Sequence, residues 1–212
     1  MIFFEPQGRD RRLMPHDPFK AMVIPRPVGW ISTMSAAGEV NLAPYSYFNG
    51  FSTSPMIVGF SSEGAKDSQV FAMETREFVW SMATYDLRDQ MNVTSAALPR
   101  GQSEFAFARL ETAPSRLVKP PRVKASPAAL ECRVTQMVDL VDVDGCDTGR
   151  RLVLGRVVGL HVDERFLKDG RLDAAAMRPI ARCGYDEYTV VERVFSMGRP
   201  AGGGDAFGDR AR

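Results

Sequence analysis

Two long runs of β-forming residues constrain the fold of this chain most strongly. They cover Ala129 to Val143 and Arg151 to Val162. Between them stands Asp-Gly-Cys-Asp-Thr-Gly at 144–149, whose aspartates and glycines are typical of a tight turn. The pattern predicts a long antiparallel β-hairpin.

Shorter segments upstream predict further strands and two helices. Strands are expected at Gly29–Met34, Val40–Leu42, Met56–Phe60 and Glu77–Met82, and helices at Lys66–Arg76 and Asp86–Ala97. Asp67 or Ser68 is the expected N-cap of the first helix, and Pro99 marks the end of the second. Several strands with short peripheral helices predict a mainly β fold with some α content (α+β), either a β-barrel or a strongly curved sheet.

The length and composition predict one domain. A chain of 212 residues that is 44% hydrophobic can bury one substantial core. Residues 1–18 contain three prolines and are expected to be an irregular lead-in. The domain itself is expected at 19–198, and the glycine-rich tail 199–212 is expected to be disordered.

The charge pattern argues against nucleic-acid and membrane partners. The 27 basic and 26 acidic residues are mixed along the chain, so no basic stripe marks a nucleic-acid or lipid surface. No window offers the ~18 apolar residues that a membrane helix needs. We therefore expect a cytoplasmic protein with small-molecule or protein partners.

The sequence lacks the residue patterns that several common kinds of site require. The cysteines at 132, 146 and 183 are odd in number and lack a CxxC pair, so they predict neither disulfides nor a zinc site. Asp142-Val143-Asp144-Gly145 fits a turn better than a calcium loop, because Leu140 and Arg151 would fall at ligand positions. The sequence shows no P-loop, GxGxxG, GxSxG or HExxH motif. With two histidines only, His16 and His161, a histidine-based mechanism is also short of parts.

One dense polar segment, PRPVGWIST followed by NLAPYSYFN, starts at Pro25. Residues before proline are pushed toward extended conformations, so the two prolines mount Arg26 on a stiff loop where its guanidinium could meet an anion or a flat ring. An ordinary exposed arginine is the alternative. Pro44 is expected to interrupt the ladder near Ala43 and Tyr45, which leaves backbone groups free to read the edge of a heterocycle.

A second polar group combines hydroxyls, a lysine and a helix start. Ser61 and Ser62 are expected in a polar loop, and Lys66-Asp67-Ser68 open the following helix. Free N–H groups at a helix N-terminus with a nearby cation suit a phosphate monoester. A capped surface helix uses the same residues.

The order of these motifs resembles a known family. PRPVGWIST, NLAPYSYFNGFSTSP, KDS opening a helix, MNVTSAALPRG and PPRVKASPAALEC are similar to motifs of the flavin reductase-like FMN-binding split-barrel family, which contains flavoredoxins and the reductase components of two-component monooxygenases. The similarity runs from about Phe19 to Val190.

The resemblance implies a split β-barrel, usually a homodimer, that binds FMN noncovalently near the subunit interface. The late motif reads Arg182-Cys183-Gly184-Tyr185, where many relatives have a second glycine. The cofactor-binding residues expected from the resemblance and the dense segments are Arg26, Ser32, Thr33, Asn41, Ala43, Pro44, Tyr45, Ser46, Ser61, Ser62, Lys66, Asp67, Ser68 and Arg182. No catalytic side chain is expected, because the flavin itself accepts hydride. No metal ligand is expected either.

Two functions remain open at this point. The first is an NADH- or NADPH-dependent flavin reductase that passes hydride through FMN to free flavin or another acceptor, with a possible monooxygenase partner. The second is an FMN-binding electron-transfer protein that a partner reduces. A barrel with a vestigial flavin site is the third, structural interpretation.

Overall fold

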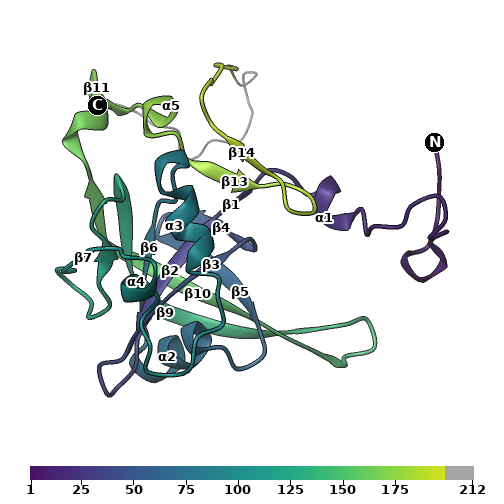
Figure 1. The fold of residues 1–212 in the computed structure, drawn as a ribbon, viewed down its shortest axis with the longest axis horizontal. Helices are drawn as coiled ribbons and strands as arrows, with labels where there is room; N and C mark the ends of the chain where they lie inside the picture. Colours follow the sequence, from purple (N-terminus) through teal and green to yellow (C-terminus); the bar gives the residue numbers. More distant parts are fainter. Residues whose placement is uncertain (199–212) are drawn as a thin grey trace.

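The computed structural model describes residues 1–198 as a curved antiparallel sheet surrounded by short helices (Figure 1). The α-helices are α1 (Phe19–Met22), α2 (Asp67–Thr75), α3 (Arg88–Val93), α4 (Glu104–Phe107) and α5 (Ala174–Met177), and the 3₁₀ turns are η1 (Pro6–Gly8), η2 (Tyr85–Leu87) and η3 (Glu164–Phe166). The strands are β1 (Arg26–Pro27), β2 (Gly29–Met34), β3 (Val40–Tyr45), β4 (Phe48–Thr53), β5 (Met56–Glu63), β6 (Glu77–Ser81), β7 (Thr112–Ala113), β8 (Arg122–Val123), β9 (Ala128–Val141), β10 (Asp147–Val162), β11 (Leu167–Lys168), β12 (Arg171–Leu172), β13 (Ile180–Arg182) and β14 (Tyr188–Val190).

The main sheet has seven strands in the order β3-β2-β6-β9-β10-β5-β4. Its two ends curl toward each other, since the Tyr45 ring on β3 packs against the Phe60 ring on β5 with centroids 4.8 Å apart. The Ser61 N–H, which donates to the Tyr47 carbonyl at 2.9 Å, extends the β4–β5 ladder. A second, three-stranded sheet, β1-β13-β14, lies beside it. The predicted fold class, mainly β with short peripheral helices, is confirmed.

The predicted hairpin is present as β9 and β10, which pair from Val141↔Asp147 to Ala128↔Val162. Its distal end projects from the body in Figure 1. The strand predicted at Gly29–Met34 is β2, with the expected bounds. The strand predicted to end at Phe60 continues as β5 to Glu63, because its last residues pair with β10. Ser61 and Ser62 therefore lie in a strand, and the prediction of a polar loop there was wrong.

The prediction that Pro44 interrupts the sheet was wrong. Pro44 lies within β3 opposite Trp30 of β2. The strand tolerates it because β3 is an edge of the sheet. The Leu42 N–H points away from β2, to the Glu104 carboxylate at 3.0 Å, and the two-residue period puts the nitrogen of Pro44 on that same outer side. Proline therefore costs the ladder no hydrogen bond there.

The first predicted helix is α2, with Lys66 as its N-cap residue and no side-chain capping bond. The predicted caps, Asp67 and Ser68, are instead its first two residues. The second predicted helix is shorter than expected, because regular α-helix spans only Arg88–Val93. Thr94 folds back at its end, where its hydroxyl donates to the Met91 carbonyl at 2.7 Å.

The interior of the barrel is aromatic. Ile31, Phe60 and Phe78 are fully buried in one cluster, and Trp30 lies in a second cluster on the other side of the sheet. A Cβ at Gly155 of β10 would overlap the Phe78 ring, so glycine is needed for this close approach. Burial of these rings supplies the main driving force for the fold.

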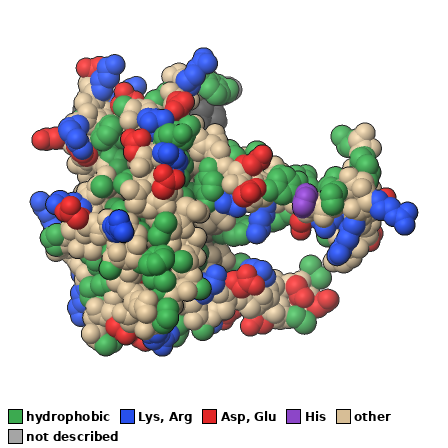
Figure 2. All heavy atoms as spheres, viewed as in Figure 1, with side chains coloured by type: hydrophobic (Ala, Val, Ile, Leu, Met, Phe, Trp, Pro, Cys, Tyr) green, Lys and Arg blue, Asp and Glu red, His purple; other side chains and the backbone are tan. Residues whose placement is uncertain are grey.

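The N-terminal lead-in extends away from the body in Figure 1, and its one helical segment is the 3₁₀ turn η1. The division into lead-in and domain stays a prediction, and the predicted tail at 199–212 lies outside the described residues. On the face shown in Figure 2, basic and acidic side chains alternate without a large patch of one sign. Within residues 1–198, no helix is long and apolar enough to span a bilayer.

Candidate functional site

A cavity of about 930 Å³ opens between the edge strand β3, the end of β5 and the N-terminus of α2. Its volume lies within the range of cofactor sites. Further walls come from α1, from the segment that follows α3, and from the β9–β10 hairpin. The residues that line it are Phe19, Lys20, Asn41, Ala43, Pro44, Tyr45, Ser46, Tyr47, Ser61, Ser62, Glu63, Ala65, Lys66, Asp67, Ser68, Thr94, Ser95, Ala96, Ala97, Leu98, Glu104, Leu140 and Arg150.

Ten of the residues predicted from the sequence meet in this cavity. They are Asn41, Ala43, Pro44, Tyr45, Ser46, Ser61, Ser62, Lys66, Asp67 and Ser68. They come from two segments that the sequence separates and the fold joins: the Asn41 side-chain amide on β3 donates to the Ser68 hydroxyl on α2 at 2.6 Å.

The hydroxyl-rich end of the cavity keeps unused hydrogen-bonding capacity. Ser62 is 1% exposed, and its hydroxyl oxygen has no hydrogen-bond partner among the described residues. Burial raises the pKa of the neighbouring Tyr45, although the nearby hydroxyls of Ser68 and Ser62 act to lower it. A buried hydroxyl without a partner costs free energy unless a ligand satisfies it, so Ser62 marks a place where a polar ligand group would fit.

Charges of both signs surround this end. Lys66 is the N-cap of α2, a helix of nine residues whose first N–H groups face an anion favourably. The guanidinium of Arg150 pairs with the Glu63 carboxylate at 3.1 Å on the rim. Asp67 pairs with Arg100 at 2.9 Å, which ties the loop after α3 to the start of α2.

Glu104 is an unexpected acid in the cavity wall. It is 8% exposed and accepts the Leu42 N–H described above. Burial raises the pKa of Glu104, and the nearby Asp67 adds to this rise. The carboxyl group therefore tends to hold a proton at higher pH than an ordinary glutamate does.

Four predicted residues are not brought to this cavity. Arg26 is buried, and its guanidinium donates to the backbone carbonyls of Lys20 at 2.6 Å, Cys183 at 2.7 Å and Val23. These bonds join α1 to the turn after β13, so backbone carbonyls take up the guanidinium of Arg26 in this structure. Its predicted contact with the cofactor stays a prediction.

The two strand hydroxyls are also turned elsewhere. Ser32 donates to the Pro121 carbonyl at 2.5 Å. Thr33 is fully buried, with its hydroxyl unpaired within the described residues. Arg182 lines a separate, smaller cavity.

Sequence reasoning missed several lining residues. The segment Thr94–Leu98 belongs to the quoted MNVTSAALPRG motif, so that motif could have placed it at the site. Nothing local marks Glu104 or Arg150, since each reaches the cavity through tertiary packing. Among residues 1–198, no three histidine, cysteine or carboxylate side chains gather as a metal site.

The chain is similar in sequence and in fold to known proteins. Residues 21–175 match the Flavin reductase like domain. An uncharacterized protein of Deinococcus radiodurans is 36% identical over 194 residues, covering 84% of this chain and 82% of that protein. The structure of nitrilotriacetate monooxygenase component B from Bacillus cereus aligns with a TM-score of 0.84 and 28% identity, covering 93% of this chain and 98% of the other. A protein with a split barrel domain from Shewanella frigidimarina aligns with a TM-score of 0.82 at 20% identity, over 94% and 100% of the two chains, which shows likeness of fold.

Proposed function

We propose a function from the premise that this chain belongs to the flavin reductase-like family, as the match over residues 21–175 shows. It is an oxidoreductase that binds FMN in the large cavity, takes hydride from NADH or NADPH, and passes it to free flavin or another acceptor. The expected split barrel is confirmed by the structures it resembles.

The observation that carries the proposal is the convergence of two polar segments on one cavity. Lys66, the N–H groups that open α2 and the serines at 61, 62 and 68 form one end that suits a phosphate monoester. The unpaired Ser62 hydroxyl lies at this end. Tyr45 and the backbone of β3 line the adjoining wall, where a flat ring and its polyol chain would lie.

Bound FMN would supply hydride acceptance and release. The protein need only bind the flavin, orient it and exclude competing reactions. The two histidines fit this division of labour. His161 pairs with Glu131 at 2.5 Å, and neither His16 nor His161 lines the cavity.

A second copy of the chain is the proposed neighbour of this cavity. Tyr47, Phe51 and Met56, on and beside β4 and β5, are 42%, 54% and 44% exposed. Leu140 and Val141 on the hairpin add to the exposed apolar surface, and Leu140 also lines the cavity. Apolar surface of this kind suits a homodimer interface next to the cofactor. Light scattering at several concentrations tests this, and a strict monomer would contradict it.

The same surface is what an electron-transfer protein reduced by a partner would need, so that function is the second candidate. A monooxygenase partner and a cytoplasmic location stay predictions. The two functions differ in whether pyridine nucleotide reduces the bound flavin.

The deciding measurement is a visible spectrum of protein loaded with FMN, desalted and then titrated anaerobically with NADH and with NADPH. Flavin bands that bleach with either nucleotide support the reductase and identify its donor. Bands that persist with both support the second candidate, and protein that retains no flavin contradicts tight binding.

Lys66→Ala tests the orientation of FMN in the cavity. Loss of the lysine should weaken FMN about tenfold or more, as expected for a charge-assisted contact, and leave riboflavin little changed. Equal weakening of both flavins would contradict a phosphate at this end. Lys124→Ala, on an exposed lysine paired with Glu111 far along the chain, is the matched control.

A further inference from the structure

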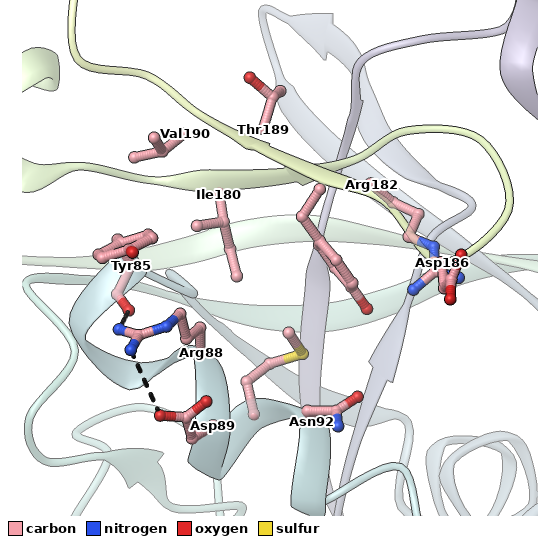
Figure 3. Close-up of a pocket in the computed structure, with 11 residues that line it drawn as sticks. Tyr85, Arg88, Asp89, Asn92, Ile180, Arg182, Asp186, Thr189 and Val190 are labelled. Atoms are coloured by element: carbon pink, nitrogen blue, oxygen red, sulfur yellow. Dashed lines mark hydrogen bonds and ion pairs between the residues drawn. The ribbon is translucent and has the colours of Figure 1, made fainter.

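A second cavity, of about 390 Å³, lies between α3 and the β13–β14 hairpin. It shares no lining residue with the large cavity, so an inference about it does not depend on FMN binding. Figure 3 shows Tyr85 and Arg88 at one end of it and Arg182 with Asp186 at the other.

The floor of this cavity is apolar and fixed. Met91 of α3 is 1% exposed and Ile180 of β13 is 6% exposed, and both belong to the second core cluster. The Ile180 N–H donates to the Ala83 carbonyl at 3.0 Å, and the Tyr85 N–H donates to the Arg178 carbonyl at 2.9 Å. These bonds tie the strand to the turn before α3, so the hollow is built into the fold.

Aromatic rings form its sides. Tyr85 lies under the Arg88 guanidinium, with 4.2 Å between that group and the ring centroid, and Tyr188 lies under Arg182 at 4.6 Å. Both rings are partly exposed. Aromatic and thioether side chains around an apolar floor favour a flat, unsaturated ligand.

The two arginines, Arg88 and Arg182, differ in whether a carboxylate pairs with the guanidinium. Arg88 donates to the Tyr85 carbonyl at 2.7 Å and approaches the Asp89 carboxylate at 3.5 Å, so its charge has a partner. Arg182 donates to the Tyr185 carbonyl and forms no ion pair among residues 1–198. A half-buried guanidinium with free donors suits a carboxylate, which it can bind through two parallel hydrogen bonds.

We propose that this cavity binds a small planar aromatic carboxylate, with the carboxylate on Arg182 and the ring over Met91 and Ile180 beside Tyr188. The volume suits one ring or two fused rings and is small for a dinucleotide. Asp186 lies on the rim near Arg182 and opposes the anion, which sets a clear expectation for its removal.

Calorimetric titration of the full chain with benzoate tests the proposal. Benzoate should bind, benzamide should bind about tenfold more weakly because it lacks the charge, and cyclohexanecarboxylate should also be weaker because it lacks the flat ring. Benzoate that fails to bind at millimolar concentration, or benzamide that binds equally well, would overturn the proposal.

Variants locate the site. Arg182→Gln should weaken benzoate about tenfold, Asp186→Asn should tighten it, and Arg165→Gln, on an exposed arginine outside the cavity, should leave it unchanged. Circular-dichroism melting checks that each variant is folded, and Asp186→Asn keeps the test valid if Arg182→Gln unfolds. Unchanged affinity in Arg182→Gln, weaker binding in Asp186→Asn, or displacement of benzoate by FMN would each overturn the assignment.

Discussion

Two glutamates are buried in this fold, and their pKa values shift in opposite directions. Glu131 of β9 is fully buried, and Glu104 at the start of α4 is 8% exposed. The Glu104 carboxylate accepts the Leu42 N–H at 3.0 Å. The Glu131 carboxylate meets His161 and accepts three backbone N–H groups, from Arg116 at 2.7 Å, Leu117 at 2.6 Å and Val118 at 3.1 Å.

The pKa directions follow from the surroundings of each carboxyl group. Burial acts to raise the pKa of Glu131, but the hydrogen bonds from His161 and the backbone outweigh it, so the pKa lies below the ordinary value. Burial raises the pKa of Glu104, and the hydrogen bonds from the Leu42 N–H and from its own backbone N–H do not reverse this. The backbone N–H groups and the imidazole around Glu131 favour its ionised form, whereas burial and the nearby Asp67 favour the protonated form of Glu104. Glu131 closes a structural network, whereas Glu104 faces a cavity with capacity left for a ligand.

The largest expected effect is on stability, from Glu131→Ala. It leaves three backbone N–H groups of the 116–118 loop and the His161 ring without their acceptor, which should cost about 3 kcal/mol or more in the free energy of unfolding. Urea unfolding measures this. Glu77→Ala is the matched control, because Glu77 accepts a single bond from the same loop, at the Lys119 N–H, and should cost about 1 kcal/mol. Equal losses would mean that the number of hydrogen bonds a glutamate accepts does not set the cost of removing it.

The sequence predicts the residues of the large cavity better than it predicts the surroundings of the two glutamates. Local motifs predicted ten residues of the large cavity, because each motif sits on one strand end or helix start. They could not predict the Glu131–His161 pair. These residues lie 30 positions apart on neighbouring strands. Two of the three irregularities in the β9–β10 register, near Leu154 and Val157, help to set which side chains meet.

Pro44 and Arg26 are two further residues whose surroundings the local sequence could not predict. The rule that proline disrupts a ladder applies to central strands, and only the strand order shows that β3 is an edge. The sequence predicted extended backbone around Arg26, which lies in the strand β1 and not in a loop. The carbonyls that accept its guanidinium come from α1 and from the turn after β13. Partners set by tertiary structure decide these cases.

The second largest effect is expected on FMN affinity, from substitution of the unpaired Ser62. Ser62→Ala removes a hydroxyl without a partner, so stability should change by less than about 0.5 kcal/mol, while FMN should bind about fivefold to tenfold more weakly. Ser126→Ala is the reverse control. Its hydroxyl lies 2.8 Å from the Met82 carbonyl and 2.9 Å from that of Ala128, so its loss should cost about 1 kcal/mol without changing FMN affinity. Urea unfolding and flavin fluorescence titration measure both quantities, and a stability loss confined to Ser62→Ala would contradict the open-cavity interpretation.

A smaller effect is expected from Glu104→Gln. The amide oxygen can still accept the Leu42 N–H, but the variant cannot add a negative charge beside Asp67 near the expected phosphate. FMN should therefore bind about twofold to fivefold more tightly at a pH where Glu104 is ionised, and riboflavin should be unaffected. Glu111→Gln, on an exposed glutamate, is the control. Tighter binding of riboflavin to the same extent would show that the charge does not act through phosphate.

The smallest and most direct test of the two glutamates is the sign of the pH dependence of stability. Glu131 has a folded pKa below its ordinary value of 4.5, so its contribution is present above that value and is lost as the pH falls through the lower folded pKa. Glu104 has a folded pKa above 4.5, so its ionisation opposes folding at higher pH, and stability is regained as the pH falls through that raised pKa toward 4.5. Glu131→Gln should therefore reduce the loss of stability that occurs as the pH falls below 4.5. Glu104→Gln should remove the gain in stability that occurs as the pH falls toward 4.5. Urea midpoints measured across the acid range in the absence of flavin distinguish the two, and changes of the same sign in both variants would mean that these surroundings do not set the pKa directions of the two carboxyl groups.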